Sequence, residues 1–259
     1  MGVLNVTPDS FSDGGRYLDI NDAYLRAKEL VEQGSDVIDI GAQSTRPKST
    51  EVGPDEEIRR LKPVLELVRK SFPDAIVSID TYFSKVADIA LELGATWIND
   101  ISGGRHDPNI LRIVSEAKCP YVITHSRGNS WTMDNLTTYN NITNDVCLEL
   151  LRLTDKAVKS GIQTKNIIWD PGLGFAKTTN QNITILRELE TLKREGFPLL
   201  IGPSRKRFIG EIVKQENPEL RLNGTIAVAC KCVEEKIEMI RVHDVREINE
   251  AVLMANEIF

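Results

Sequence analysis

The sequence predicts an α/β protein whose eight parallel strands close into a (β/α)8 barrel. Apolar runs of strand length alternate with amphipathic helical patterns along all 259 residues. Eight such units in about 250 residues are typical of this barrel. No Pro/Ser-rich linker divides the chain, so we expect a single domain over residues 1–259. A doubly wound open sheet is the alternative, but it usually has fewer strands and a GxGxxG first turn, which the sequence lacks.

The expected elements follow one another in regular order. In the first helical pattern Ala23, Ala27, Leu30 and Val31 share one face, and Gly34 follows as a cap. The apolar runs predict strands at 1–6, 36–40, 75–80, 95–100, 119–125, 166–170, 197–202 and 236–243. The patterns between them predict helices at 21–33, 55–71, 84–93, 108–117, 143–160, 182–195, 205–215, 220–235 and 244–258.

Charge and composition exclude several classes of protein. With 32 basic and 38 acidic residues the chain has a formal charge of −6, which is unsuited to a general nucleic-acid binder. No apolar stretch approaches the ~20 residues of a membrane helix, and the N-terminus is no signal peptide. We therefore expect a cytoplasmic protein, or an organellar one in a eukaryote. Because Met1 opens directly on a core strand, we also expect trimming at the N-terminus.

The four cysteines predict no zinc site. Cys119, Cys147, Cys230 and Cys232 form no CxxC pair, and the chain has only three histidines. Buried or incidental thiols in a reducing compartment are the expected state.

Polar residues stand at or just past every predicted strand end. They are Asn5, Asp39, Asp80, Asn99, Asp100, His125, Asp170, Ser204 and His243. In a barrel these ends share one face, and that face carries the active site. Helix capping is the alternative for any one of them, but capping explains eight polar ends less well.

Basic residues accompany these ends in an otherwise acidic chain. They are Arg46, Lys48, Arg205, Lys206, Arg207 and Arg241. Barrels often bind phosphate in the loops after strands seven and eight, where Ser204 would add a hydroxyl at a helix start. A solvated basic helix start is the alternative.

Asp80, Asn99 and Asp170 follow apolar residues and should be partly buried. A buried carboxylate needs a partner, either the cation of Lys206 or a ligand rich in N–H donors. The amino-pyrimidinone edge of a pterin or guanine would suit these acceptors, whereas internal struts at the barrel rim are the alternative.

The loop NVTPDSFSDGG (5–15) is polar and glycine-rich, which is typical of a mobile lid. Its Asp9 and Asp13 would face a metal or a developing cation, and Asn5 offers a hard oxygen to Mg²⁺. The sequence contains no GxSxG and no cysteine beside a histidine. This favours a reaction driven by leaving-group ionisation and electrostatics.

These patterns together resemble the dihydropteroate synthase family over nearly the whole chain. The motifs are NVTPDSFSDGG (5–15), DIGAQSTRP (39–47), SIDT (78–81), INDISGG (98–104), DPGLGF (170–175), GPSRK (202–206) and RVHDV (241–245). The resemblance implies an alkyl transferase, usually a homodimer. It would join 6-hydroxymethyl-7,8-dihydropterin diphosphate to 4-aminobenzoate with Mg²⁺ and release pyrophosphate.

The resemblance also implies roles for individual residues. The pterin would be bound by Asp80, Asn99, Asp170, Lys206 and Arg241; the diphosphate by Asn5, Arg46 and His243; the aminobenzoate by Thr45, Pro47, Phe175 and Ser204. Asn5 would also bind Mg²⁺. Asp9, Asp13, Lys206 and Arg241 would act in catalysis, Asp13 by stabilising positive charge as the diphosphate leaves.

The chain departs from the family at two places. The family usually has GGES before TRP, where this chain has Ala42 and Gln43, and it often has Met beside the histidine that Thr124 and Ser126 flank here. Two other functions stay open: a pterin-binding domain that transfers methyl groups to a corrinoid, and a non-catalytic pterin-binding paralogue.

Overall fold

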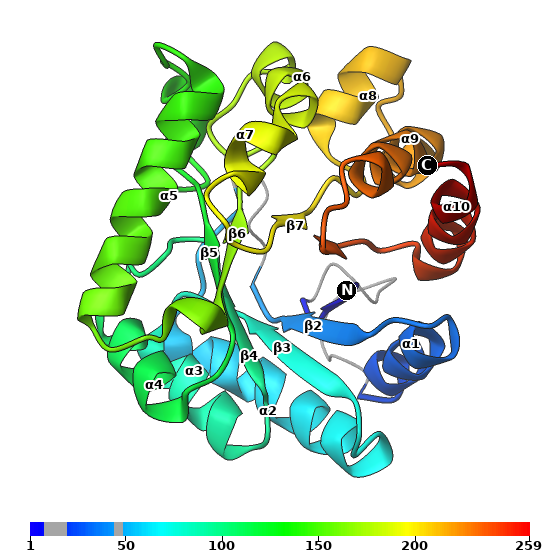
Figure 1. Cartoon of the computed structure of the whole chain (residues 1–259). Helices are drawn as coiled ribbons and strands as arrows, with labels where there is room; N and C mark the ends of the chain where they lie inside the picture. Colours follow the sequence, from blue (N-terminus) through cyan, green and yellow to red (C-terminus); the bar gives the residue numbers. More distant parts are fainter. Residues whose placement is uncertain (8–19, 44–48) are drawn as a thin grey trace.

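The strands form a ring that the helices surround (Figure 1). The structure, a computed structural model, describes residues 1–7, 20–43 and 49–259. One parallel sheet runs in the order β1 (Gly2–Asn5), β2 (Val37–Gly41), β3 (Ile76–Asp80), β4 (Trp97–Asp100), β5 (Tyr121–Thr124) and β6 (Ile167–Asp170). A second pairs β7 (Leu200–Ile201) with β8 (Met239–Ile240), also in parallel.

Single backbone bridges join the two sheets into a closed barrel. Trp169 bridges Leu199 on one side, and Gly2 bridges Val242 on the other. The Val242 N–H also donates to the carbonyl oxygen of Met1 at 3.0 Å. The predicted barrel is therefore confirmed, and the open-sheet alternative is wrong.

Strands β7 and β8 are shorter than the predicted runs 197–202 and 236–243. Pro198 and Pro203 flank β7, and a proline has no N–H to extend a ladder of hydrogen bonds.

The helices largely follow the predicted pattern. They are α1 (Ile20–Glu32), α2 (Pro54–Ser71), α3 (Ser84–Glu92), α4 (Asn109–Ala117), α5 (Ile142–Lys159), α6 (Thr179–Arg187), α7 (Leu189–Lys193), α8 (Arg207–Val213), α9 (Leu222–Glu234) and α10 (Val245–Ile258). The single helix predicted at 182–195 is wrong. Thr178 and Gln181 form a capping box that starts α6 earlier, and the helix breaks at Glu188 before α7. Helix α8 is followed by Lys214 in a left-handed conformation, and a 3₁₀ turn (Pro218–Arg221) precedes α9.

Side chains point alternately to the two faces of the strands and so form two separate hydrophobic cores. The larger one lies between strands and helices, and a smaller one groups Val122, Ile168 and Leu200 with Met1, Trp97 and Met239. Because successive side chains point to opposite faces, residues two positions beyond this smaller core share its interior face. Among the described residues, no helix is both long enough and apolar enough to span a lipid bilayer.

Candidate active site

Three of the predicted ligand-binding residues meet around Gly202, just past β7. A Cβ atom placed on Gly202 would lie 3.9 Å from each of Asp170 Oδ2, Lys206 Nζ and Arg241 Cβ. Asp170 ends β6, whereas Lys206 caps α8 and Arg241 follows β8. Barrel closure therefore brings residues from distant parts of the chain to one interior position.

Asp80 and Asn99 lie on the same interior face, because the register pairs them across β3 and β4. The Arg241 guanidinium connects this side to the rest. Its Nη2 donates to Asp80 Oδ2 at 2.8 Å and its Nε donates to Asp39 Oδ2 at 2.6 Å. The Asn99 amide also donates to Asp39 Oδ2, at 3.2 Å. Arg241 thus pairs with the carboxylates on β2 and β3, whereas the sequence suggested Lys206 as the cation that pairs with the buried carboxylates.

The sequence pattern marks Asp39 only as a polar strand end. It is fully buried, and its Oδ1 has no hydrogen-bond partner among the described residues. An unpaired buried carboxylate oxygen is costly unless a ligand donates to it. The signal for this residue was an aspartate inside an otherwise apolar strand.

Burial raises the pKa of two carboxyl groups in this cluster and lowers the pKa of its lysine. It raises the pKa of Asp80 to about 7, although Arg241 opposes the change. It also raises the pKa of Asp170, against the opposing effects of Lys206 and the Gly172 N–H. Burial lowers the pKa of Lys206 to about 8. For Arg241 burial acts in the lowering direction, but the charges of Asp39 and Asp80 outweigh it and raise the pKa. Such shifts in a cluster of buried groups are typical of functional sites.

Phe175 lies beside this cluster. Lys206 Nζ sits 4.8 Å from the centre of the Phe175 ring and donates to the Leu173 carbonyl. An ammonium over an aromatic face is attracted by the ring quadrupole. Phe175 and Lys206 therefore hold each other in place.

Ser204 and His243 are in direct contact. Ser204 Oγ lies 2.9 Å from His243 Nδ1 and accepts the His243 backbone N–H at 3.1 Å. Asn5 ends β1 opposite Gly41 and is partly buried. The predicted aminobenzoate residue Ser204 and the predicted diphosphate residue His243 are thus neighbours.

Several predicted site residues lie outside the described residues. They are Asp9, Asp13, Thr45, Arg46 and Pro47, together with Lys48. Their parts in the site stay predictions from the sequence.

Two polar residues at strand ends do not face the site, Asp100 and His125. Asn99 keeps the end of β4 in the site, so the expectation of eight shared ends is wrong at β5. Asp100 accepts the N–H groups of Ser102 and Gly104 and the Tyr121 hydroxyl, each at 2.7 Å. His125 contacts Glu149 on α5, with 2.9 Å between Nε2 and Oε2. Strand alternation explains both, since each follows an inward-facing residue directly.

Two of the predicted cations are also paired elsewhere. Arg205 forms an ion pair with Asp244 at 2.5 Å, and the exposed Arg207 forms one with Asp134 at 2.8 Å. Their expected part in an anion site is therefore not supported, and Lys206 alone of the three points to the cluster.

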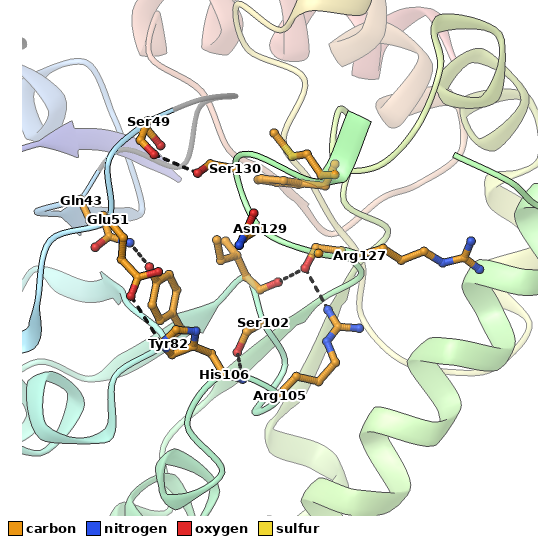
Figure 2. Close-up of a pocket in the computed structure, with 15 residues that line it drawn as sticks. Gln43, Ser49, Glu51, Tyr82, Ser102, Arg105, His106, Arg127, Asn129 and Ser130 are labelled. Atoms are coloured by element: carbon orange, nitrogen blue, oxygen red, sulfur yellow. Dashed lines mark hydrogen bonds and ion pairs between the residues drawn. The ribbon is translucent and has the colours of Figure 1, made fainter. Parts of the chain in front are cut away.

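A cavity of about 390 Å³ opens beside Phe175, between the loops that follow β2 to β5 (Figure 2). The rings of Tyr82 and His106 lie 4.3 Å apart at its wall, and Arg105 Nη2 donates to Ser126 Oγ at 2.9 Å. Phe175 links the cavity to Lys206, whereas Asp170, Lys206 and Arg241 do not line it.

The two departures from the family pattern have local roles at this cavity. Gln43 accepts the Val52 N–H at 3.0 Å and donates to the Tyr82 hydroxyl. Ser126 donates to the Ile101 carbonyl at 2.7 Å. Both polar side chains are thus held by hydrogen bonds within the surrounding loops.

The barrel and its buried acceptors define a class of protein, the pterin-binding barrels. A family model described as "Pterin binding enzyme" matches residues 1–243. The dihydropteroate synthase of Synechocystis sp. is 44% identical over 259 residues, which cover 100% of this chain and 89% of that protein. A dihydropteroate synthase structure from Clostridium difficile has a TM-score of 0.93 at 39% identity, covering 100% of this chain and 95% of that one. The chain belongs to the pterin binding enzymes and, among them, to the dihydropteroate synthases, which are transferases of folate synthesis.

Some relatives are much longer. The chain is 44% identical to the folic acid synthesis protein fol1 of Pneumocystis carinii and spans 36% of its length.

Proposed function

We propose that this chain condenses 6-hydroxymethyl-7,8-dihydropterin diphosphate with 4-aminobenzoate to give 7,8-dihydropteroate and pyrophosphate. One observation carries the proposal: Asp170, Lys206 and Arg241 converge on a single interior position at the carboxyl end of the barrel. Similar structures support it, since one from Xanthomonas albilineans holds 7,8-dihydropteroate and one from Thermus thermophilus holds 4-aminobenzoate.

The chemistry of the interior face suits a pterin. Asp80, Asn99 and Asp170 offer carboxylate and amide oxygens, and Asp39 Oδ1 adds an acceptor without a described partner. The amino-pyrimidinone edge presents several N–H donors, so binding would satisfy oxygens that are otherwise buried at a cost. Lys206 would donate to the ring, and Arg241 would stack on it.

The diphosphate would lie on the side of Asn5, His243 and Arg46. Mg²⁺ fits this arrangement, with Asn5 as its protein ligand, because Mg²⁺ usually keeps several waters and takes the rest of its oxygens from substrate phosphates. The described residues hold no group of three or more His, Cys, Asp or Glu that could bind a metal by themselves. When bound, the ion would neutralise charge on the leaving diphosphate.

We further propose a dissociative reaction, in which the C–O bond breaks before the amine attacks. Asp13 and Asp9 of the lid would stabilise the positive charge at the pterin methylene. The aniline nitrogen of 4-aminobenzoate is neutral at pH 7, so its attack needs no strong general base. Thr45, Pro47, Phe175 and Ser204 would hold the aminobenzoate close to His243, on the diphosphate side. A homodimer in the cytoplasm is the expected setting, which the family resemblance supports.

The test is an assay of both products. Purified chain with pterin diphosphate should release pyrophosphate and form dihydropteroate only when 4-aminobenzoate and Mg²⁺ are both present, and EDTA should stop the reaction. Pterin binding without aminobenzoate-dependent pyrophosphate release would instead favour the methyl-transferring domain or the non-catalytic paralogue. No pterin binding would refute all three.

A further inference from the structure

Lys177 is a buried lysine that neither the sequence motifs nor the proposed mechanism uses. It stands at the end of the segment 171–177, which follows β6 and carries Phe175. Only 3% of Lys177 is exposed. A lysine is rarely buried to this extent without partners. The three nearest acceptors of its Nζ are His125 Nδ1 at 2.8 Å and the carbonyl oxygens of Gly172 and Phe175, each at 3.0 Å.

These three acceptors match the three N–H bonds of an ammonium group, and the His125 carbonyl oxygen is a more distant fourth acceptor at 3.4 Å. Burial lowers the pKa of Lys177 well below its usual value, but the nearby Asp170 carboxylate opposes this change. A neutral amine would have only two N–H bonds and would turn its lone pair toward the third acceptor. The geometry therefore favours the charged form.

His125 transmits this arrangement to α5. Because the Glu149 carboxylate can only accept, His125 Nε2 carries the proton and donates to Glu149 Oε2 at 2.9 Å, and Nδ1 of the neutral ring accepts from Lys177. Burial lowers the pKa of His125 to about 4, so the ring is neutral at pH 7. Arg127 Nε holds the other oxygen of Glu149 at 3.1 Å. An unbroken series of hydrogen bonds thus runs from α5 through β5 to the segment 171–177.

The segment that Lys177 holds is one that the active site needs. Gly172 lies against β5 so closely that a Cβ atom there would be 1.9 Å from the His125 carbonyl oxygen. The Gly172 N–H in turn donates to Asp170 Oδ1 at 2.7 Å, and Phe175 faces Lys206. Fixing the carbonyls of Gly172 and Phe175 therefore fixes both the carboxylate and the ring.

We propose that Lys177 is a positioning residue for the pterin and aminobenzoate sites, with His125 and Glu149 orienting its ammonium group. The inference rests on the proposed function in that it assigns Asp170 and Phe175 to those sites. Lys177 itself touches neither substrate.

Kinetics of two variants test this role. Lys177→Met removes every hydrogen bond of the ammonium group, whereas Lys177→Gln keeps two N–H donors without the charge. Measured below the melting temperature of each variant, Lys177→Met should raise the KM for the pterin diphosphate about tenfold or more while kcat changes less than about threefold. Lys177→Gln should recover part of the loss, and Lys165→Met, at an exposed lysine, should leave both constants unchanged. A folded Lys177→Met protein with wild-type KM values would overturn the proposal.

A second measurement needs no variant and no activity. In ¹⁵N spectra of the wild-type chain, which has three histidines, His125 should appear as the neutral Nε2–H tautomer between pH 5 and 8. Its resonances should shift when pteroate binds, because Lys177 couples it to the segment 171–177. An Nδ1–H tautomer, or no response to bound pteroate, would overturn the proposal even if the enzyme makes dihydropteroate. If the chain shows the expected tautomer and the response to pteroate but has no synthase activity, the proposed function is wrong and the role of Lys177 stands.

Discussion

At the scale of single residues, Asp170 shows how one carboxylate serves both protein and ligand. Its Oδ1 accepts the Gly172 N–H at 2.7 Å, whereas its Oδ2 faces the space beside Gly202. In Asp170→Asn the new amide N–H₂ would point either at the N–H donors of the pterin or at the Gly172 N–H. Two donors would then face each other in a buried place, and neither would have an acceptor. We expect calorimetry to show a loss of pterin affinity of about 100-fold or more. Asp74→Asn, at an exposed aspartate, is the control, and equal affinities in both variants would remove Asp170 from the pterin site.

Glu57 on α2 allows a prediction about pH and stability. It is 1% exposed, and its Oε1 has no hydrogen-bond partner among the described residues. Burial raises its pKa from 4.5 to about 7, against a hydrogen bond from Thr81. An acid whose pKa is raised by folding binds its proton more tightly in the native state. The stability that it contributes is therefore present below pH 4.5 and is lost as the pH rises toward 7.

Glu57→Gln should remove this dependence. Relative to the variant, the wild-type chain should lose on the order of 3 kcal/mol between pH 4.5 and 7, measured by urea denaturation in a pH series. Parallel stability curves for the two proteins over this range would show that Glu57 keeps an ordinary pKa in the folded state.

At the scale of elements, strand register decides which polar residues reach the site. The sequence pattern locates the strand ends well enough to group Asp80, Asn99 and Asp170. It could not tell Asn99 from Asp100, because neighbouring residues on a strand point to opposite faces and a shift of one residue exchanges them. His125, Glu149 and Lys177 were beyond prediction for a related reason: their partnership depends on the packing of α5 and the segment 171–177 against the outer face of β5.

The turn after β6 gives a prediction at this scale. Gly172 and Gly196 both have a positive φ, +67° and +81°, but only Gly172 is crowded, by the His125 carbonyl. Gly196→Ala should therefore cost about 1 kcal/mol of unfolding free energy, from backbone strain alone. Gly172→Ala should cost about 2 to 4 kcal/mol and weaken pterin binding as well, because the clash displaces the segment that holds Asp170. Equal costs in thermal or urea unfolding would mean that the segment can move away from β5 freely.

At the scale of the whole molecule, closure of the ring is what makes the site. Arg241 follows the last strand and bonds to carboxylates on the second and third, which are neighbours only because β8 returns to β1. The alternation of strands and helices was enough to predict this closure, since right-handed βα units in this number leave few other topologies. The shortness of β7 and β8 was not predicted, because it depends on where two prolines interrupt hydrogen bonding rather than on hydrophobic pattern.

The same closure predicts how inhibitors should behave. The proposed aminobenzoate site takes Phe175 from the segment after β6 and Ser204 from the loop after β7, with Thr45 and Pro47 from the loop after β2. A dihydropteroate synthase structure from Yersinia pestis is a sulfonamide drug complex. An aryl sulfonamide has the shape and polarity of 4-aminobenzoate, so we expect it to raise the KM for 4-aminobenzoate in initial-rate assays and to leave kcat unchanged. Phe175→Ala should weaken the sulfonamide and 4-aminobenzoate together, whereas the exposed control Trp131→Ala should weaken neither. If saturating 4-aminobenzoate does not relieve the inhibition, the sulfonamide binds outside the amine site. The assignment of Phe175 and Ser204 to a site shared by both molecules would then be wrong.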